Sequence, residues 1–277
     1  VQTRAGWHKT QMALNTRDTR SLHERGIALS PTVREIYSDQ KIPEGCSYVG
    51  LDGWNFRSLA KKLRLQKPFD PFLAECLVQT SKVFFKTFNP DLAFLFSDEI
   101  NLLFSRYAAF DRRLEKVDSI FAGLASSTLY KLLNRRYTDL PEISFDCRVI
   151  PVKGGETLEY LIWRQKEARR NCYNAYAQHC LIGKSGLEPK RATERLKNVK
   201  LKDLKRLIRQ HEIRLSQIPR WHERGILVYW ERFSKEGFDP IRSRQVFAKR
   251  RRIHADRCPP RFDTLEGKRL VKRVMWT

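Results

Sequence analysis

The sequence lacks the residue patterns of a zinc site or a disulfide framework. Its six cysteines include no Cys-x-x-Cys pair, and its six histidines show no His-Glu-x-x-His spacing. No apolar run approaches the ~18–20 residues that span a bilayer, and no signal-peptide pattern is visible. We therefore expect reduced thiols in a cytoplasmic protein that does not associate with membranes.

Acidic residues are also scarce. The 277 residues include 54 Lys and Arg against 31 Asp and Glu, a formal charge of +23. Residues 190–277 alone hold 26 basic and 10 acidic residues, a formal +16. A region this basic is expected to bind a polyanion, usually nucleic acid, and the dense run Lys249-Arg250-Arg251-Arg252 supports this. A generally basic, well-solvated surface is the plainer alternative.

The acids that are present stand at the edges of two apolar runs. Asp52 follows Val49-Gly50-Leu51, and Ser97-Asp98-Glu99 interrupts the run from Phe94 to Phe104. An Asp-Gly pair after a strand is usually only a turn. A two-residue hairpin, however, favours Asn-Gly or Asp-Gly, so Asp-Glu at such a turn needs another reason. Carboxylates that converge repel one another unless a cation lies between them, so the pattern is typical of a two-metal phosphoryl-transfer site.

The order of expected elements predicts the fold. Strands are expected over residues 47–51, 92–96, 100–104 and 143–152, and helices over residues 55–63, 71–85 and 110–133. This order is β-α-β-β-α-β, the ferredoxin-like arrangement of nucleic-acid polymerase palms, and it predicts an α+β fold. Fold alone does not fix function.

Three regions are expected along the chain: a poorly ordered extension over residues 1–33, a palm-like catalytic domain over residues 34–152, and a largely helical, basic region over residues 153–277 that is expected to bind nucleic acid. Helices are expected over residues 158–181 and 187–196. Short β-like runs occur at residues 226–230 and 245–247, and the last twenty residues are basic and weakly patterned.

Four motifs together resemble the tRNA-His guanylyltransferase superfamily, and more closely its archaeal and bacterial guanylyltransferase-like branch. They span about residues 34–235 and are specific in this order and spacing. They are Leu51-Asp52-Gly53-Trp54-Asn55-Phe56 with Lys67-Pro68; Phe96-Ser97-Asp98-Glu99; Ser144-Phe145-Asp146-Cys147-Arg148-Val149; and Trp163-Arg164-Gln165 with Asn171 and Asn174, followed by Lys184-Ser185-Gly186-Leu187, Ala192 and Leu196.

The resemblance implies an enzyme that adds nucleotides to the 5′ end of tRNA, with ATP or GTP as substrates and two Mg²⁺ ions as cofactors. It implies Asp52, the Gly53 carbonyl and Asp98 as metal ligands, and Asp52, Asp98 and Glu99 as the catalytic acids. The implied nucleotide- and phosphate-binding residues are Gly53, Trp54, Asn55, Phe56, Arg57, Lys67, Ser97, Arg113 and Lys116. The expected tRNA-binding residues are Arg164, Arg169, Arg170, Asn171, Asn174, Lys249, Arg250, Arg251 and Arg252. The resemblance further implies a homo-oligomer, a dimer or tetramer.

One departure bears on the substrate. The family's eukaryotic members carry His-Ile-Asn-Asn-Leu-Tyr-Asn where this chain has the run from Arg169 to Asn174, without the His. In those enzymes this region is tied to the tRNA-His anticodon. The departure, with Trp54 and Arg57, is typical of the branch associated with template-dependent repair of 5′-truncated tRNA, which is the leading hypothesis. The alternatives are a dedicated tRNA-His guanylyltransferase, a non-catalytic RNA-binding protein and a nucleotide cyclase-like enzyme.

Overall fold

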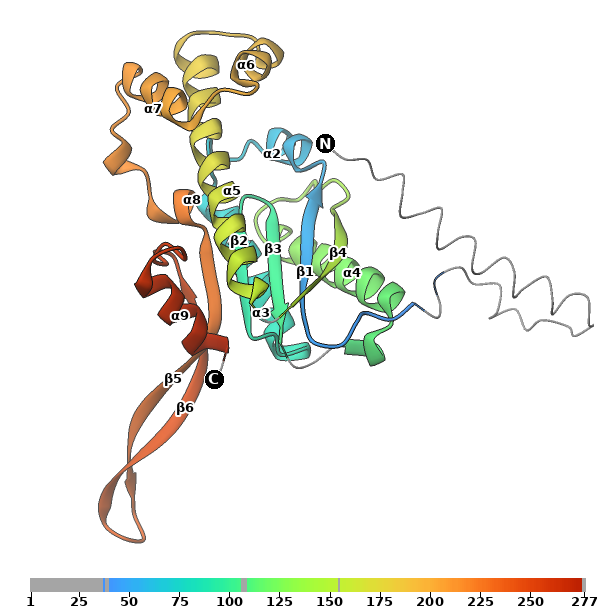
Figure 1. Ribbon diagram of the computed structural model, residues 1–277, viewed down its shortest axis with the longest axis vertical. Helices are drawn as coiled ribbons and strands as arrows, with labels where there is room; N and C mark the ends of the chain where they lie inside the picture. The colour runs from blue at the N-terminus through green and yellow to red at the C-terminus, as the bar shows by residue number, and fades with distance from the viewer. Residues whose placement is uncertain (1–36, 38–39, 106–108, 154, 276–277) are drawn as a thin grey trace, which may run out of the picture.

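The structure is a computed structural model that describes residues 37, 40–105, 109–153 and 155–275. The expected extension over residues 1–33, and the expected start of order near residue 34, lie outside the described residues. One antiparallel sheet runs through the described chain in the order β4-β1-β3-β2-β5-β6 (Figure 1). Its strands are β1 (Cys46–Trp54), β2 (Leu92–Phe96), β3 (Glu99–Phe104), β4 (Ser144–Val152), β5 (Ile226–Asp239) and β6 (Arg244–Asp256).

The first four strands, with the helices between them, confirm the predicted palm-like arrangement. The helices of this part are α2 (Phe56–Lys62), α3 (Pro71–Thr87) and α4 (Leu114–Leu133). Helix α3 begins as predicted, because Asp70 accepts a hydrogen bond from the Leu73 amide and Pro71 occupies the first turn. Helix α4 was predicted from residue 110 but begins at residue 114. Phe110, Asp111 and Arg112 have positive φ angles of 56°, 53° and 62°, which no right-handed helix accommodates.

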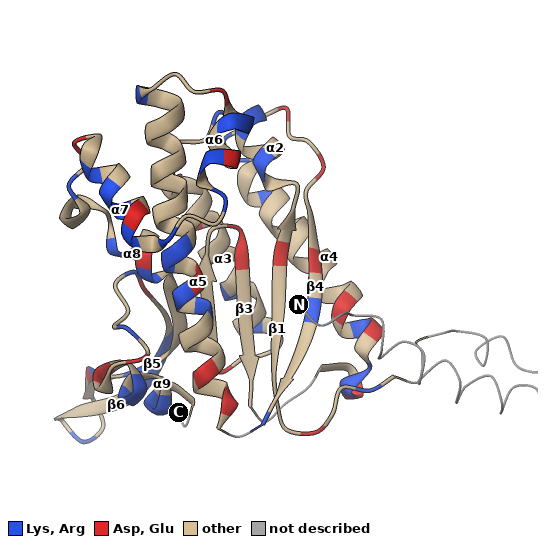
Figure 2. Ribbon diagram, turned by 45° about the horizontal axis from the view of Figure 1, so that its top comes forward, with Lys and Arg blue, Asp and Glu red and all other residues tan. Residues whose placement is uncertain are grey.

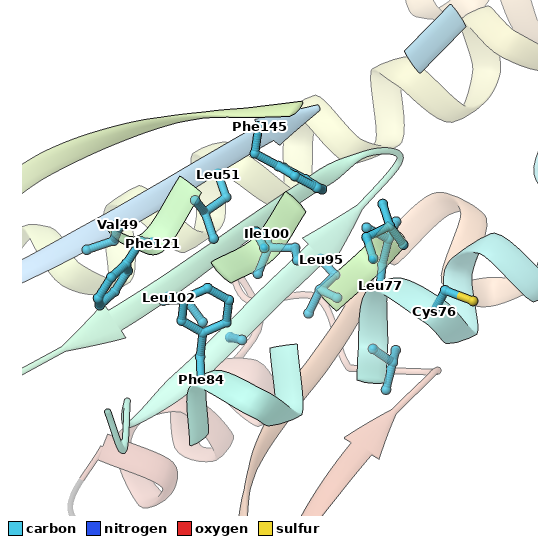
Figure 3. Packing of buried hydrophobic residues seen from close by; sticks show 14 of the residues in the cluster. Val49, Leu51, Cys76, Leu77, Phe84, Leu95, Ile100, Leu102, Phe121 and Phe145 are labelled. Carbon is cyan, nitrogen blue, oxygen red and sulfur yellow. The ribbon is translucent and has the colours of Figure 1, made fainter. Parts of the chain in front are cut away.

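Alternation along β1 divides the core between the two faces of the sheet. Val49 and Leu51 point toward α3 and α4, where they join Leu77, Phe84 and Phe121 in the main apolar cluster (Figure 3). Burial of this cluster is the main stabilising contribution to the palm-like part. The residues that alternate with Val49 and Leu51, Asp52 among them, therefore point toward the opposite face.

Helix α5 (Glu156–His179) covers that opposite face. The Tyr48 hydroxyl donates to the Thr157 carbonyl over 2.9 Å, and the Tyr48 and Tyr160 rings stack with centroids 4.1 Å apart. The C-terminal helix α9 (Leu265–Met275) packs on the same face through Val271 and Val274. At 24 residues, α5 is about 36 Å long. It extends past the end of the sheet that carries Asp52 (Figure 1).

Beyond that end, the second half of α5 packs against α6 (Pro189–Leu196) and α7 (Leu201–Gln210) through an apolar cluster that includes Tyr173, Leu196 and Ile208. The helical predictions for this region are confirmed. A π-helical turn (Cys180–Lys184), a 3-10 turn (Leu215–Gln217) and the short helix α8 (Arg220–Arg224) complete the connections. Within the described residues, no helix is both long and apolar enough to cross a bilayer.

The β5–β6 hairpin is much longer than the two short runs that the sequence predicted. Residues 226–229 of β5 pair with β2 and extend the palm sheet. The distal half of the hairpin projects away from the body (Figure 1) and is largely exposed on both faces. Charged residues there hide the alternation that would have revealed a strand.

Candidate active site

Three acidic side chains stand in register across the sheet. Asp52 of β1 lies directly opposite Glu99 of β3 on one side and opposite Asp146 of β4 on the other. Figure 2 shows acidic residues on the neighbouring strands β1, β3 and β4. Like charges directly opposite in a sheet destabilise it unless something compensates them. This end of the sheet therefore concentrates negative charge in a chain that is otherwise strongly basic.

Asp98 joins this group from the tip of the β2–β3 hairpin. The Gly53 amide donates to the Asp98 carbonyl oxygen over 3.2 Å, which holds the end of β1 against the hairpin turn. Ser97 has a φ of 52°, so the turn has the left-handed geometry of a tight hairpin although its sequence is unfavourable. The structure thus brings together Asp52, Gly53 and Asp98, as the sequence predicted.

The Asp98 carboxyl is poorly compensated. Burial raises its pKa, the nearby charge of Asp52 raises it further, and a hydrogen bond from Ser97 opposes the shift. In the described part of the chain, no ion pair involves Asp98. A buried carboxylate that lies beside a second carboxylate, without a cation, is the environment that a divalent ion would relieve.

Glu99 is compensated instead by arginines. Its carboxylate accepts from Arg148 of β4 at 3.1 Å and from Arg164 of α5, and Arg148 also reaches Asp52 at 3.2 Å. Burial raises the pKa of Glu99 to about 7, an effect that Arg164 and Arg148 oppose and that Asp52 and Asp98 reinforce. Both carboxylate oxygens of Glu99 therefore have guanidinium partners.

These observations define which oxygens fit a metal. Asp52 and Asp98 offer carboxylate oxygens, and Gly53, which follows Asp52, offers its backbone carbonyl oxygen. Such an oxygen-only set suits Mg²⁺, which completes its coordination with waters and substrate phosphates. The described residues hold no group of three or more His, Cys, Asp or Glu side chains that could hold a metal by themselves.

Two clefts open on either side of the acids. The first has a volume of about 370 Å³ and lies between α2, the start of α3 and the hairpin turn. Asp98 and Ser97 line it together with Phe56, Arg57 and Lys67. A cleft with two cations opposite a carboxylate and a hydroxyl suits a phosphorylated ligand and its metal. Trp54 and Asn55 do not line it: the Trp54 side chain is exposed, and Asn55 is the N-cap residue before α2.

The second cleft is larger, about 820 Å³, and lies between the sheet, α5 and α6. Asp52 and Glu99 form its floor, and Arg57 and Asn171 border both clefts. Its walls carry further α5 side chains that the sequence assigned to tRNA, namely Arg164, Arg170 and Asn174. A wide cleft with basic and amide walls suits a polynucleotide end.

Comparison with known proteins supports the resemblance that the four motifs carry. The family model described as tRNA-His guanylyltransferase matches residues 31–153. A probable tRNA-His guanylyltransferase of Mus musculus is 25% identical over 230 residues, which are 78% of this chain and 77% of that protein. A probable tRNA-His guanylyltransferase of Bos taurus is 28% identical over 210 residues, 72% of this chain and 70% of that protein. A solved bacterial tRNA-His guanylyltransferase-like protein in complex with ATP is 25% identical, with a TM-score of 0.66, over 95% of this chain and 100% of that one.

The family model, the curated relatives and the solved structure all resemble this chain and support the tRNA-His guanylyltransferase superfamily. Members of this superfamily are nucleotidyltransferases that act on the 5′ end of tRNA. The resemblance inferred from the four motifs and the enzyme class are thereby confirmed.

Two residues that the superfamily resemblance assigned to phosphate binding lie elsewhere. Arg113 immediately precedes α4, pairs with Glu115 at 2.6 Å and forms a β-bridge with Lys41. Lys116 follows in the first turn of that helix. This turn lies beside the beginning of β1, because the Ile42 amide donates to the Arg112 carbonyl, whereas Asp52 lies near the other end of the strand. Neither residue lines either of the two clefts.

The expected tRNA-binding residues also separate into groups. Arg169 does not face the second cleft and pairs with Glu223 at 2.9 Å. The run Lys249–Arg252 lies on β6, where Arg252 pairs with Glu231 and Arg251 stacks over Trp230. These residues form a second basic surface on the hairpin.

Sequence reasoning missed Arg148 and Asp146 as site residues, although both stand in a motif that it singled out. The signal was available: in an alternating strand both point to the same face, and pairing of β4 with β1 places that face beside Asp52. The sequence alone did not show that β4 pairs with β1.

Proposed function

We propose that this chain is a template-dependent 3′-5′ nucleotidyltransferase that adds nucleotides to the 5′ end of tRNA and repairs 5′-truncated tRNA. The observation that carries this proposal is the position of the acids. Asp52 and Asp98 lie between a cleft suited to a nucleoside triphosphate and a wider cleft suited to an RNA end. A reaction between two phosphorylated substrates needs this two-sided access.

The proposed reaction has two balanced transfers. First, an oxygen of the RNA 5′-monophosphate attacks the α-phosphorus of an NTP, a new P–O–P bond forms, and pyrophosphate leaves. Second, the 3′-hydroxyl of the incoming NTP attacks the activated 5′-phosphorus, a phosphodiester bond forms, and the nucleoside monophosphate leaves. The hydroxyl proton passes to solvent or to a nearby basic oxygen. Mg²⁺ bound at Asp52, Asp98 and the Gly53 carbonyl would lower the hydroxyl pKa and neutralise phosphate charge.

The side chains divide the remaining work. Lys67 and Arg57 would bind the triphosphate in the first cleft, with Ser97 beside it. Arg148 and Arg164 would contact the RNA 5′-phosphate in the second cleft. Glu99 would act as a positioning residue, because it holds both guanidinium groups in place by hydrogen bonds. Pairing with the opposite strand of the RNA would select the base, while the protein contacts phosphates.

A second candidate is a dedicated tRNA-His guanylyltransferase, and the names of the curated relatives favour it. Against it, the region that carries the His in eukaryotic members here holds Arg169-Arg170-Asn171. Arg170 and Asn171 line the cleft beside the acids, where phosphate contacts are the expected role.

The deciding experiment is nucleotide addition to two RNAs in parallel with Mg²⁺ present. One is tRNA-Phe that lacks its first nucleotide, and the other is tRNA-His that lacks its extra 5′ G. Efficient addition to truncated tRNA-Phe, with the base set by the opposing nucleotide, supports general repair. Addition to tRNA-His alone supports the second candidate. If the wild-type protein binds both RNAs but adds nucleotides to neither, both candidate functions are contradicted. Asp98→Ala serves as the inactive control.

A further inference from the structure

A compact basic pocket of about 250 Å³ lies on a different side of α5 from the acidic cleft. Residues 164, 167, 170, 171, 174 and 178 of α5 line the acidic cleft, whereas residues 162, 165, 166 and 169 line this pocket. Helix α8 and the loop before α9 close it. The pocket is therefore built from three segments that lie far apart in the sequence.

Positive charge exceeds negative charge in this pocket. The lining includes five cations, which are Lys166, Arg169, Arg220, Arg224 and Arg261, and two acids, which are Glu223 and Asp263. Each acid already forms an ion pair with one arginine: Glu223 pairs with Arg169 at 2.9 Å, and Asp263 pairs with Arg261 at 2.6 Å. In the described part of the chain, no ion pair involves the other three cations.

The pocket has a fixed floor. Gln165 is buried, and its side-chain amide donates to the carbonyls of Arg224 and Pro260, each over 3.2 Å. Its oxygen accepts from the Phe262 amide over 2.8 Å. These bonds join α5, α8 and the loop before α9, so the cations on all three segments keep their relative positions. Preorganised donors bind an anion without the cost of ordering them first.

The neighbouring helix α7 adds to the charge. Lys205 lies over the Tyr173 ring, and the Tyr173 hydroxyl donates to the Glu223 carboxylate. Burial lowers the pKa of Lys205, and the charges of Arg169, Arg209 and Arg261 lower it further against the opposing effect of Glu223. Figure 2 shows basic residues on neighbouring parts of α5, α7 and α8. The surroundings of the pocket are thus short of negative charge.

We propose that this pocket binds a backbone phosphate of the RNA substrate, with Lys166, Arg220 and Arg224 as its ligands. The width of one helix, about 10–12 Å, separates it from the acidic cleft. RNA that places its 5′ end at Asp52 and Asp98 can therefore cross α5 and present a second phosphate here. This inference rests on the proposed function only for the identity of the anion.

The test is RNA binding by the full chain, measured by fluorescence anisotropy with a 5′-truncated tRNA labelled at its 3′ end. The double variant Lys166→Ala/Arg220→Ala removes two exposed cations that make no ion pair in the described structure, so folding should be kept. We expect about ten-fold weaker binding, and a salt dependence shallower by roughly 0.8 in log–log slope, because the contact with one phosphate is lost. The control is Lys86→Ala/Lys131→Ala, which removes two exposed cations from α3 and α4 on the other face of the sheet.

Unchanged affinity and salt slope in the pocket variant overturn the proposal. A variant that loses affinity for ATP or pyrophosphate, measured by calorimetry, while it keeps its RNA affinity would assign the pocket to a free phosphate compound and overturn the RNA assignment. Because binding needs no turnover, weaker binding by the pocket variant supports the pocket even if the wild type adds no nucleotides, an outcome that contradicts only the proposed function.

Discussion

The backbone amide of Gly53 donates to the carbonyl oxygen of Asp98 over 3.2 Å, and this bond fixes the end of β1 to the hairpin tip. A second contact leaves little room at Gly53: a Cβ added there would lie 2.4 Å from the buried Phe56 ring. The absence of a side chain at Gly53 thus allows Phe56 of α2 to pack against the end of β1, beside the acids.

Replacement of Asp98 by Asn should separate catalysis from folding. We expect nucleotide addition to fall at least a thousand-fold, since charge stabilisation at the phosphates is lost. The free energy of unfolding should not fall, because a poorly compensated buried charge is removed. Thermal unfolding should show that Mg²⁺ stabilises the wild type but not the variant. Glu142→Gln, which removes an exposed acid before β4, should behave as wild type; equal Mg²⁺ stabilisation of all three proteins would contradict the metal assignment.

Glu99→Gln should distinguish a positioning residue from a metal ligand. The change keeps the shape but weakens the hydrogen bonds to the mostly buried Arg164 and to Arg148, so the free energy of unfolding should fall by about 1 kcal/mol. The kcat/KM for the RNA should fall about a hundred-fold because two guanidinium groups lose their orientation. The Mg²⁺ concentration for half-maximal rate should stay within about two-fold of wild type. A large shift in that concentration would make Glu99 a metal ligand instead.

Lys67 and Lys116 should differ although the resemblance assigned both to phosphate binding. Lys67→Ala should raise the KM for the NTP about ten-fold, the effect of one lost charge-assisted contact. Lys116→Ala should leave that KM unchanged, because Lys116 lines neither cleft. Steady-state kinetics at saturating RNA measures both. A higher KM for the NTP in Lys116→Ala, with an unchanged KM in Lys67→Ala, would place the triphosphate at the beginning of α4.

His222 should make stability depend on pH. Burial lowers its pKa from 6.5 to about 4. Its Nδ1 bonds to the Tyr176 hydroxyl at 2.9 Å, and its buried Nε2 has no partner in the described structure. The unfolded chain therefore takes a proton near pH 6.5 and the folded chain only near pH 4. The stabilisation is complete above pH 6.5, and about 3 kcal/mol is lost as the pH falls to 4.

Urea unfolding of the wild type and His222→Phe across this pH range measures the effect. The phenylalanine keeps the contacts with Phe69 and Trp221 but cannot titrate. The difference in the free energy of unfolding between the wild type and His222→Phe should shrink or reverse as the pH falls. Parallel curves at all pH values would show that the ring titrates equally in both states.

The sequence determined much of the palm by itself. Alternation at Val49 and Leu51 predicted a strand with Asp52 at its end, and the interrupted run around Asp98 predicted the hairpin. These are local signals, since a period of two fixes which residues share a face. The Pro at the start of α3 likewise marked a helix boundary that the structure keeps.

Only the tertiary structure decided which of these pieces meet. It placed β4 beside β1 and so brought Arg148 to Asp52, and it laid α5 across the sheet so that Arg164 reached Glu99. It also set Arg113 away from the clefts and joined β5 to the edge of β2. Contacts of this kind depend on how separate faces pack together. The periodicity within one segment specifies its buried face, while the partner of that face is set by the packing of the whole core.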